Sequence, residues 1–144
     1  MKEYKFRGFD AVGDKGWVYG DLTHNQKVTA TGLEPRVMVG GYEVFPESVG
    51  QYTGVKDKEG KEIYEGDLVE CVSWNEFFSD GNGPMEPFRR KMYVDFRKGG
   101  FKMVEPMPYT MQDHEWDIIF NGDIQIVGNR FFEEQKKKEQ TKVG

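Results

Sequence analysis

The chain has 144 residues and a formal net charge of −5. This length fits one domain, since domains usually run to roughly 100–200 residues, and it excludes two large domains. The acidic balance weighs against a general phosphate-neutralising surface, because nonspecific affinity for nucleic acid comes mainly from clustered Lys and Arg.

The first predicted element is a β-hairpin near the N-terminus. Residues 4–7 alternate aromatic and cationic side chains, and residues 17–22 form a second strand-like segment. The segment from Gly13 to Gly16 between them is rich in turn-forming residues. We therefore expect the two segments to pair as antiparallel strands.

Two further strand candidates follow at residues 27–31 and 36–39. The segment from Gly32 to Pro35 separates them, and Pro cannot donate a hydrogen bond to a strand ladder. The sequence leaves open whether this segment is another hairpin or an irregular excursion. Beyond it, the polar residues 57–61 predict a turn, after which the chain enters a strand at residues 68–72.

The second half of the chain carries one predicted loop and then a hairpin. Between residues 74 and 87, Gly, Asn and Pro favour irregular structure, so we expect a mobile loop there. A hairpin is predicted around the turn Gly99-Gly100, with its returning strand at residues 101–104. Three alternating apolar residues of its first strand are expected to face the core: Met92, Val94 and Phe96.

The clearest hairpin signal lies near the end of the chain. The dipeptide Asn121-Gly122 suits a type I′ turn, because both central residues need positive φ. We expect the flanking segments 117–120 and 123–127 to pair across it. Residues 109–116 are the one helix candidate inside the domain, and the charged tail from Glu133 is expected to be a frayed helix or disordered.

The whole pattern is that of a mainly β protein of short antiparallel strands and hairpins. Without a repeat or heptad array, it favours a small barrel or sandwich over a βαβ fold. No apolar run approaches the roughly 20 residues of a membrane helix, and the first residues lack a signal-peptide pattern. The single Cys71 cannot form an internal disulfide. We therefore expect a soluble, cytoplasmic protein with no membrane partner.

Five motifs spread along the chain carry a further signal. They are residues 5–10 (KFRGFD), 17–22 (WVYGDL), 49–57 (VGQYTGVKD), 60–69 (GKEIYEGDLV) and 126–129 (IVGN). In this order, over residues 4–132, they resemble the motifs of the YopX family of phage and prophage proteins. The stretch from Val49 to Val69 is too long for chance agreement.

The resemblance implies a phage or prophage origin, a β-rich fold and self-association as a homo-oligomer. It implies one domain over residues 1–132, made of an N-terminal hairpin region at 1–56 and an SH3-like small barrel at 57–132. A charged, flexible tail at 133–144 follows. The resemblance implies no activity, because no catalytic residue set is established for the family.

Two positions depart from the family pattern. Phe9 stands where the family usually has Trp, which keeps an aromatic anchor. After Asn129 the chain continues Arg-Phe-Phe-Glu, whereas the family usually has a Tyr-Glu-Asn type ending. A tail-mediated contact of other members is therefore not carried over to this chain.

The sharpest functional signal is the basic and aromatic stretch from Phe88 to Lys102. It holds six cations against one acid, Asp95, or +5 within a chain of −5. On the face opposite the core, cations would meet phosphates and Tyr93 would stack on a base. The alternative is a solvated sheet face that simply carries charge. The candidate binding residues are Arg89, Arg90, Lys91, Tyr93, Arg97, Lys98 and Lys102.

Two of the motifs offer structural or recognition residues. They are Gly50, Gln51, Tyr52, Thr53 and Gly54 in one, and Glu65, Gly66 and Asp67 in the other. The first is either a recognition loop or a structural turn that seats its tyrosine in the core. In the second we expect Gly66 to supply backbone freedom at a bend and Asp67 to cap free amides.

The sequence shows no organised catalytic or metal-binding set. The acids between Glu59 and Glu70 lack the ligand spacing of a calcium loop. His24 and His114 lie far apart in sequence, and Cys71 sits in a strand pattern typical of a small core residue. No glycine loop for phosphate occurs, so we expect no cofactor.

Three hypotheses follow for the function. The first is a non-enzymatic phage accessory protein that self-associates and binds a macromolecule of phage or host. The alternative is a nucleic-acid-binding module that works through residues 88–102. The third, hydrolysis by the carboxylates near Glu65 and Asp67, has only residue type in its favour.

Overall fold

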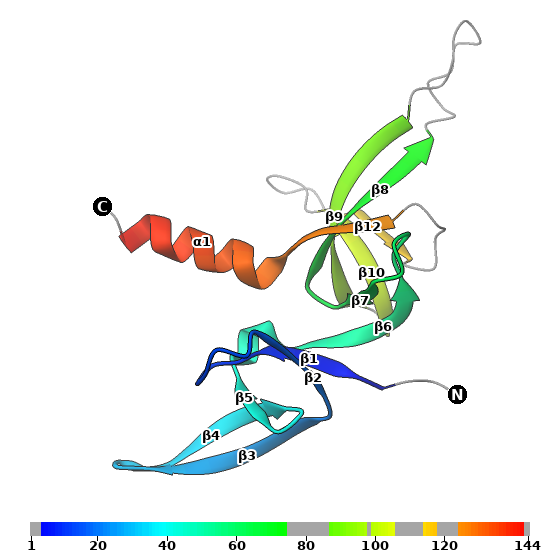
Figure 1. The fold of residues 1–144 in the computed structure, drawn as a ribbon. Coiled ribbons are helices and arrows are strands. Elements are labelled where there is room, and N and C mark those ends of the chain that lie inside the picture. Colours follow the sequence, from blue (N-terminus) through cyan, green and yellow to red (C-terminus); the bar gives the residue numbers. More distant parts are fainter. Residues whose placement is uncertain (1–3, 75–86, 98, 106–113, 118–123, 143–144) are drawn as a thin grey trace, which may run out of the picture.

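The computed structural model describes residues 4–74, 87–97, 99–105, 114–117 and 124–142. Within them the chain forms three antiparallel sheets followed by a C-terminal helix (Figure 1). The prediction of a mainly β protein built from antiparallel strands is therefore confirmed.

The first sheet has four strands in the order β2-β1-β6-β7. They are β1 (Phe6–Phe9), β2 (Trp17–Gly20), β6 (Gly50–Lys56) and β7 (Glu62–Tyr64). β1 pairs with β2 from Phe6 opposite Gly20 to Phe9 opposite Trp17, which confirms the N-terminal hairpin. The β6–β7 hairpin contains the predicted polar turn and spans the expected boundary between residues 56 and 57.

The second sheet, in the order β3-β4-β5, is a long hairpin with a short third strand. Its strands are β3 (Leu22–Thr29), β4 (Gly32–Val39) and β5 (Tyr42–Val44). The hairpin alternative is thus the one observed, but the turn falls at Ala30-Thr31 and residues 32–35 begin β4. Pro35 is tolerated inside β4 because β5 pairs only with Val37 to Val39, so β4 has one neighbour at the proline.

The third sheet has five strands in the order β11-β10-β9-β8-β12. They are β8 (Asp67–Trp74), β9 (Pro87–Arg97), β10 (Gly100–Glu105), β11 (His114–Asp117) and β12 (Ile124–Asn129). The β9–β10 pairing confirms the hairpin around Gly99-Gly100. Over the described residues this sheet does not close into the expected SH3-like barrel, since its order is linear and β6 and β7 pair within the first sheet.

One prediction near the end of the chain is wrong for the described residues, and another is untested. The helix candidate at residues 109–116 fails, since its described part belongs to strand β11, which pairs with β10. The hairpin expected across Asn121-Gly122 has its turn and nearly all of its first strand outside the described residues, so it stays a prediction. On the described side of that turn, β12 pairs with β8.

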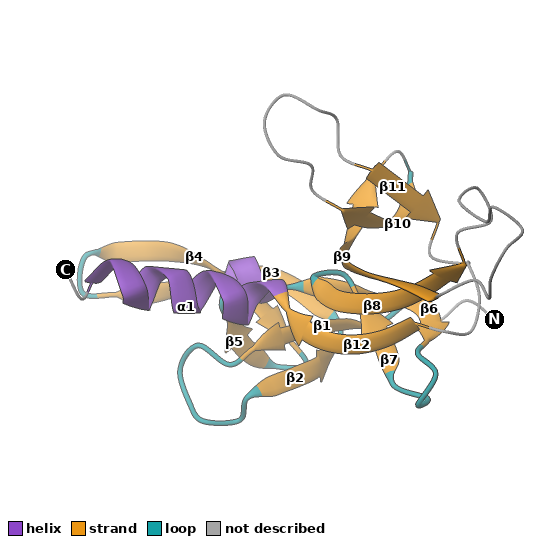
Figure 2. Cartoon of the chain, turned by 90° about the horizontal axis from the view of Figure 1, so that it is seen from above, coloured by secondary structure: helices purple, strands orange, loops and turns teal. Residues whose placement is uncertain are grey.

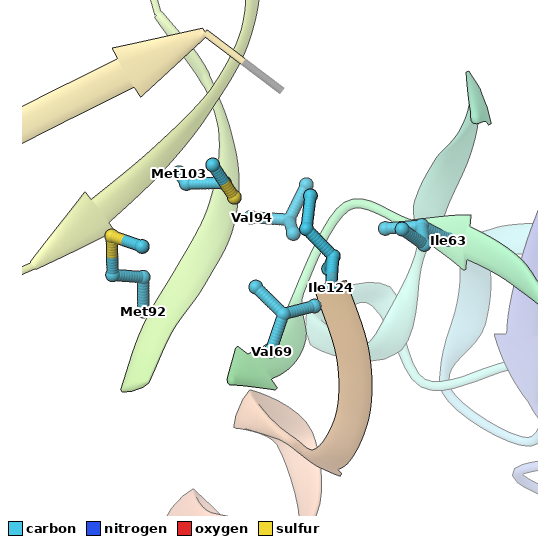
Figure 3. Close-up of a cluster of buried hydrophobic side chains, with 6 residues drawn as sticks. All are labelled: Ile63, Val69, Met92, Val94, Met103 and Ile124. Atoms are coloured by element: carbon cyan, nitrogen blue, oxygen red, sulfur yellow. The ribbon is translucent and has the colours of Figure 1, made fainter. Parts of the chain in front are cut away.

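The larger core lies under the third sheet and is closed by β7. Figure 3 shows its six buried side chains, which are Ile63, Val69, Met92, Val94, Met103 and Ile124. Met92 and Val94 therefore face the core as predicted. Phe96 does not: it is 52% exposed and packs edge-on against Phe101 on β10.

The tail forms a helix, α1 (Arg130–Lys142), over the described residues. Asn129 begins it as an N-cap, since its side-chain oxygen accepts the N–H groups of Phe131 at 2.8 Å and Phe132 at 3.4 Å. Of the two alternatives expected for the tail from Glu133, a frayed helix or a disordered segment, the structure has a helix, and it starts three residues earlier. In the described part of the chain no helix is long and apolar enough to cross a membrane.

Candidate functional site

The β3–β4 hairpin, residues 22–39 and hereafter the arm, has one apolar face that runs from the core into solvent. Because strand side chains alternate, this face carries Leu22, His24, Gln26 and Val28 opposite Val39, Val37, Pro35 and Leu33. At the base, Val39 is fully buried in a second core with Val18 and Val44. At the tip, Val28 and Leu33 face each other and are 84% and 64% exposed.

The opposite face of the arm is polar and stabilises the hairpin away from the core. Lys27 contacts both carboxylate oxygens of Glu43, at 3.1 and 3.0 Å. Arg36 donates from Nε to Asn25 Oδ1 at 2.6 Å. A surface ion pair is worth about 0–1 kcal/mol. The Lys27 contact joins β3 to β5, and the Arg36 contact joins β4 to β3.

The base of the arm is held close to β2. Gly40 has φ of +58°, and a Cβ there would collide with the carbonyl oxygen of Tyr19. Its N–H donates to the carbonyl of Asp21 at 3.1 Å. Glycine at this position therefore permits the approach that sets the direction of the arm.

An aromatic cluster joins the start of α1 to the N-terminal half. It consists of Phe9, Trp17, Phe45, Phe131 and Phe132, with ring centroids 5.4 to 6.2 Å apart in the recorded pairs. Phe131 is buried, whereas Phe45 and Phe132 remain 36% and 39% exposed. The predicted aromatic anchor at Phe9 thus packs against α1. Figure 2 shows α1 and the arm extending to the same side of the molecule.

A buried ion pair lies where the N-terminal, central and C-terminal motifs meet. Arg7 contacts Asp67 Oδ1 at 2.7 Å, and their side chains are 9% and 2% exposed. The guanidinium lies 4.3 Å from the ring centre of Trp17 and 5.0 Å from that of Tyr64. Burial raises the pKa of the Asp67 carboxyl, and the Arg7 charge and hydrogen bonds from Tyr64 and Asn129 oppose that rise.

The bend before Asp67 has the form expected from its sequence. Gly66 has φ of +94°, and Asp67 Oδ2 accepts the N–H of Tyr64 at 2.8 Å. The Gly66 N–H also donates to Val94, while its carbonyl accepts the N–H of Arg130. Gly66 and Asp67 therefore connect the first sheet, the third sheet and α1.

A small cavity of about 70 Å³ lies beside this junction, at the start of α1. Its walls carry both signs of charge, with Arg7 and Arg130 against Glu47 and Glu65. Burial raises the pKa of Glu65, and Arg7 Nε has no hydrogen-bond partner among the described residues. A space of this size holds only a few waters or a group of similar volume, and its mixed charge selects no class of ligand.

The basic stretch is partly neutralised where its side chains are described. Asp95 accepts from Arg97 Nε at 3.1 Å and lies 3.9 Å from Arg130. Arg130 also covers the ring of Tyr93, 5.0 Å from its centre, so the stacking surface predicted for a base is occupied on that side. Lys91 is exposed, and Lys102 lies opposite Asp95 on β10. The side chains of Arg89, Arg90 and Lys98 lie outside the described part, so a nucleic-acid interface stays a prediction.

The segment from Gly50 to Gly54 is a strand and not a recognition loop. Tyr52 is buried and packs against Tyr64, with 5.5 Å between ring centres. Thr53 donates its hydroxyl to the Ile63 carbonyl at 2.8 Å, and Gln51 pairs with Phe6 on β1. Of the two alternatives left by the sequence, the geometry favours the one that seats the tyrosine in the core.

The other polar candidates have structural partners. Asp57 caps its turn by accepting the N–H groups of Glu59 and Lys61, and it accepts that of Ile126 on β12. Cys71 packs against the larger core, as expected for a small core residue. His24 lies exposed on the arm. Within the described ranges no three His, Cys, Asp or Glu side chains group closely enough to hold a metal ion.

Sequence reasoning missed the arm tip and the buried arginine. The signal for the tip was the apolar pair Val28 and Leu33, placed symmetrically about Ala30-Thr31, but Pro35 obscured the second strand. The signal for Arg7 was a cation in the middle of an otherwise aromatic strand pattern. The position of the tip depends on a strand, β4, whose sequence signal is weak because it contains a proline. The burial of Arg7 depends on Asp67, which is distant in sequence.

Comparisons with known proteins agree with the motifs. The family model described as YopX protein matches residues 5–133. No curated protein matches the sequence. The crystal structure of protein EF1440 from Enterococcus faecalis is similar, with 20% sequence identity, coverage of 90% of this chain and 94% of that chain, and a TM-score of 0.45. Because the family match spans most of its length, the chain belongs to the YopX family.

Proposed function

We propose that this protein is a non-enzymatic phage or prophage accessory protein of the host cytoplasm that self-associates and binds a macromolecular partner. One observation carries the proposal: the arm presents an apolar tip, Val28 and Leu33, to solvent at the end of a hairpin anchored in the core. Apolar groups gathered at an exposed site mark interaction surfaces more often than isolated ones do. Self-association is also what the YopX resemblance implies.

The test is light scattering after size exclusion, over a range of protein concentrations. We expect a discrete oligomer for the natural protein and a shift toward monomer for Val28→Glu, because burying the new carboxylate at an interface is costly. Val12→Glu is the matched control, since Val12 is 75% exposed in the β1–β2 loop and outside the arm. A monomer at all concentrations, or an equal effect of both substitutions, contradicts the proposal.

The same columns test the nucleic-acid alternative. Single-stranded and duplex oligonucleotides are added at low and moderate salt, because phosphate-driven binding weakens steeply as salt rises. With Asp95 paired to Arg97 and near Arg130, we expect no salt-sensitive co-elution. Salt-sensitive co-elution that is lost when Arg89, Arg90 and Lys91 are replaced by Ala would favour the nucleic-acid module.

A further inference from the structure

The outer strand of the arm has an open edge. β3 is eight residues long and, in the described sheet, pairs only with β4. The two strands pair without a register shift from Leu22 opposite Val39 to Thr29 opposite Gly32. Figure 1 shows β3 along the outer rim of the arm.

This edge lacks the features that usually protect an edge strand. Natural edges are short, bulged, interrupted by Pro or studded with charge. β3 has no Pro and no bulge, and its one charged residue, Lys27, is held on the polar face by Glu43. The opposite edge strand, β5, has only three residues. The row of backbone groups along β3 is therefore suited to pairing with another strand.

We infer that β3 pairs with β3 of a second copy of this chain, antiparallel and across a two-fold axis at Asn25. The inference rests on the proposed self-association and names the strand and register through which it occurs. A two-fold interface needs a surface that complements itself, and an antiparallel strand can pair with its own copy. The result is one six-stranded sheet in the order β5-β4-β3-β3-β4-β5.

The register follows from which side chains share a face. With Asn25 opposite its own copy, His24 lies opposite Gln26, and Leu22 lies opposite Val28. This matches the two apolar residues of the strand and places Lys27 opposite Thr23, so no like charges meet. A shift by one residue on one strand sets the apolar face against the polar face. Centring the axis on Gln26 or on His24 leaves Val28 opposite His24 or Gly20.

The same register explains the exposed tip. Leu22 packs against the N-terminal core of its own copy, beside Val39. Val28 of one copy then lies next to Leu22 of the other and has its own Leu33 on its other side, so the row of apolar side chains continues across the axis. Val28, which is 84% exposed in the single chain, thereby has an apolar neighbour on each side.

Site-directed crosslinking of the full chain tests the register, in a Cys71→Ser background. Asn25→Cys places a thiol on the axis next to its own copy, so a short bismaleimide is expected to convert most of the protein to covalent dimer. Val28→Cys is the matched control. In this register residue 28 of one copy lies opposite residue 22 of the other, so the two thiols are six residues apart along the strand direction. Its crosslinked yield is expected to be at least tenfold lower. A double His24→Cys/Gln26→Cys variant repeats the test without touching Asn25, which accepts from Arg36.

The outcomes separate the two claims. Efficient crosslinking at residue 25 and at the 24/26 pair, with little at residue 28, supports the β3–β3 register. Equal or stronger crosslinking at residue 28 overturns it in favour of a tip-to-tip contact. An oligomer in light scattering that none of these thiols crosslinks overturns the register and leaves the proposed self-association standing. A monomer in light scattering overturns both.

Discussion

The buried pair of Arg7 and Asp67 gives a quantitative test of the junction. Arg7→Met keeps the length of the side chain but leaves the Asp67 carboxylate without its cation, 2% exposed. Removing one member of a buried ion pair costs about 3–5 kcal/mol. The hydrogen bonds from Tyr64 and Asn129 stay in place and reduce that cost. We therefore expect a loss of about 3 kcal/mol, a large part of the roughly 5–15 kcal/mol of a small domain.

The assay is urea unfolding followed by tryptophan fluorescence and circular dichroism. Lys5→Met is the control on the same segment, because Lys5 contacts Glu62 at 2.6 Å with both side chains more than a quarter exposed, and such a pair is worth about 0–1 kcal/mol. Adding Asp67→Asn to Arg7→Met should recover part of the loss, since no buried charge remains. A cost for Arg7→Met no larger than for Lys5→Met, or a double variant less stable than the single one, refutes the argument.

The pH dependence of the Arg7→Met cost follows from the direction of the pKa. A native pKa raised above the unfolded value means that ionisation of the acid opposes folding. Loss of the cation raises the pKa of Asp67 further. The cost should therefore be small below the ordinary Asp value of 3.8 and grow as pH rises through the native pKa. A cost that grows as pH falls contradicts this reasoning.

Three further outcomes are expected. Asn129→Ala removes the cap of α1 and should cost about 1–2 kcal/mol with loss of helical circular dichroism, whereas Asn129→Ser keeps most of the cap; equal losses would show that the cap is unimportant. Gly50→Ala should strongly lower the urea midpoint because its Cβ meets the Glu65 carbonyl, while Gly100→Ala, with no atom within 4 Å, should change it little. Since burial raises the pKa of Glu65, Glu65→Gln should gain stability relative to the natural protein as pH rises above 4.5, and a gain confined to acid pH would contradict this.

The sequence predicted best where a turn and two alternating strands lie close together. The β1–β2 and β9–β10 hairpins follow from local turn residues and period-two patterns, and the β7–β8 bend follows from Glu65-Gly66-Asp67. These elements are determined by neighbours in sequence. Their positions could therefore be predicted without knowledge of the remaining chain.

The failures occur where distant partners compete with local signals. The helix expected over residues 109–116 is one case, because its described residues, from His114 to Trp116, pair instead with β10. The tail has no apolar stripe along its length, and only the packing of Phe131 and Phe132 on distant rings, with the cap from Asn129, explains a helix there. The sequence suggested that the ring of Tyr93 is open for stacking on a base. Arg130, which covers that ring, lies far along the chain, so its position could not be predicted.

The junction also bears on the order in which the molecule is completed during synthesis. Arg7, Asp67 and Asn129 come from the beginning, the middle and the end of the described chain, yet they share one set of contacts. Contacts between residues so distant in sequence slow folding, because the chain loses entropy in closing the long loop before the contact can stabilise it. The arm and the β1–β2 hairpin can form from local contacts as the chain emerges from the ribosome. Asp67 acquires its last partner only after Asn129 has been made, so premature termination before that residue leaves an acid at the junction incompletely bonded.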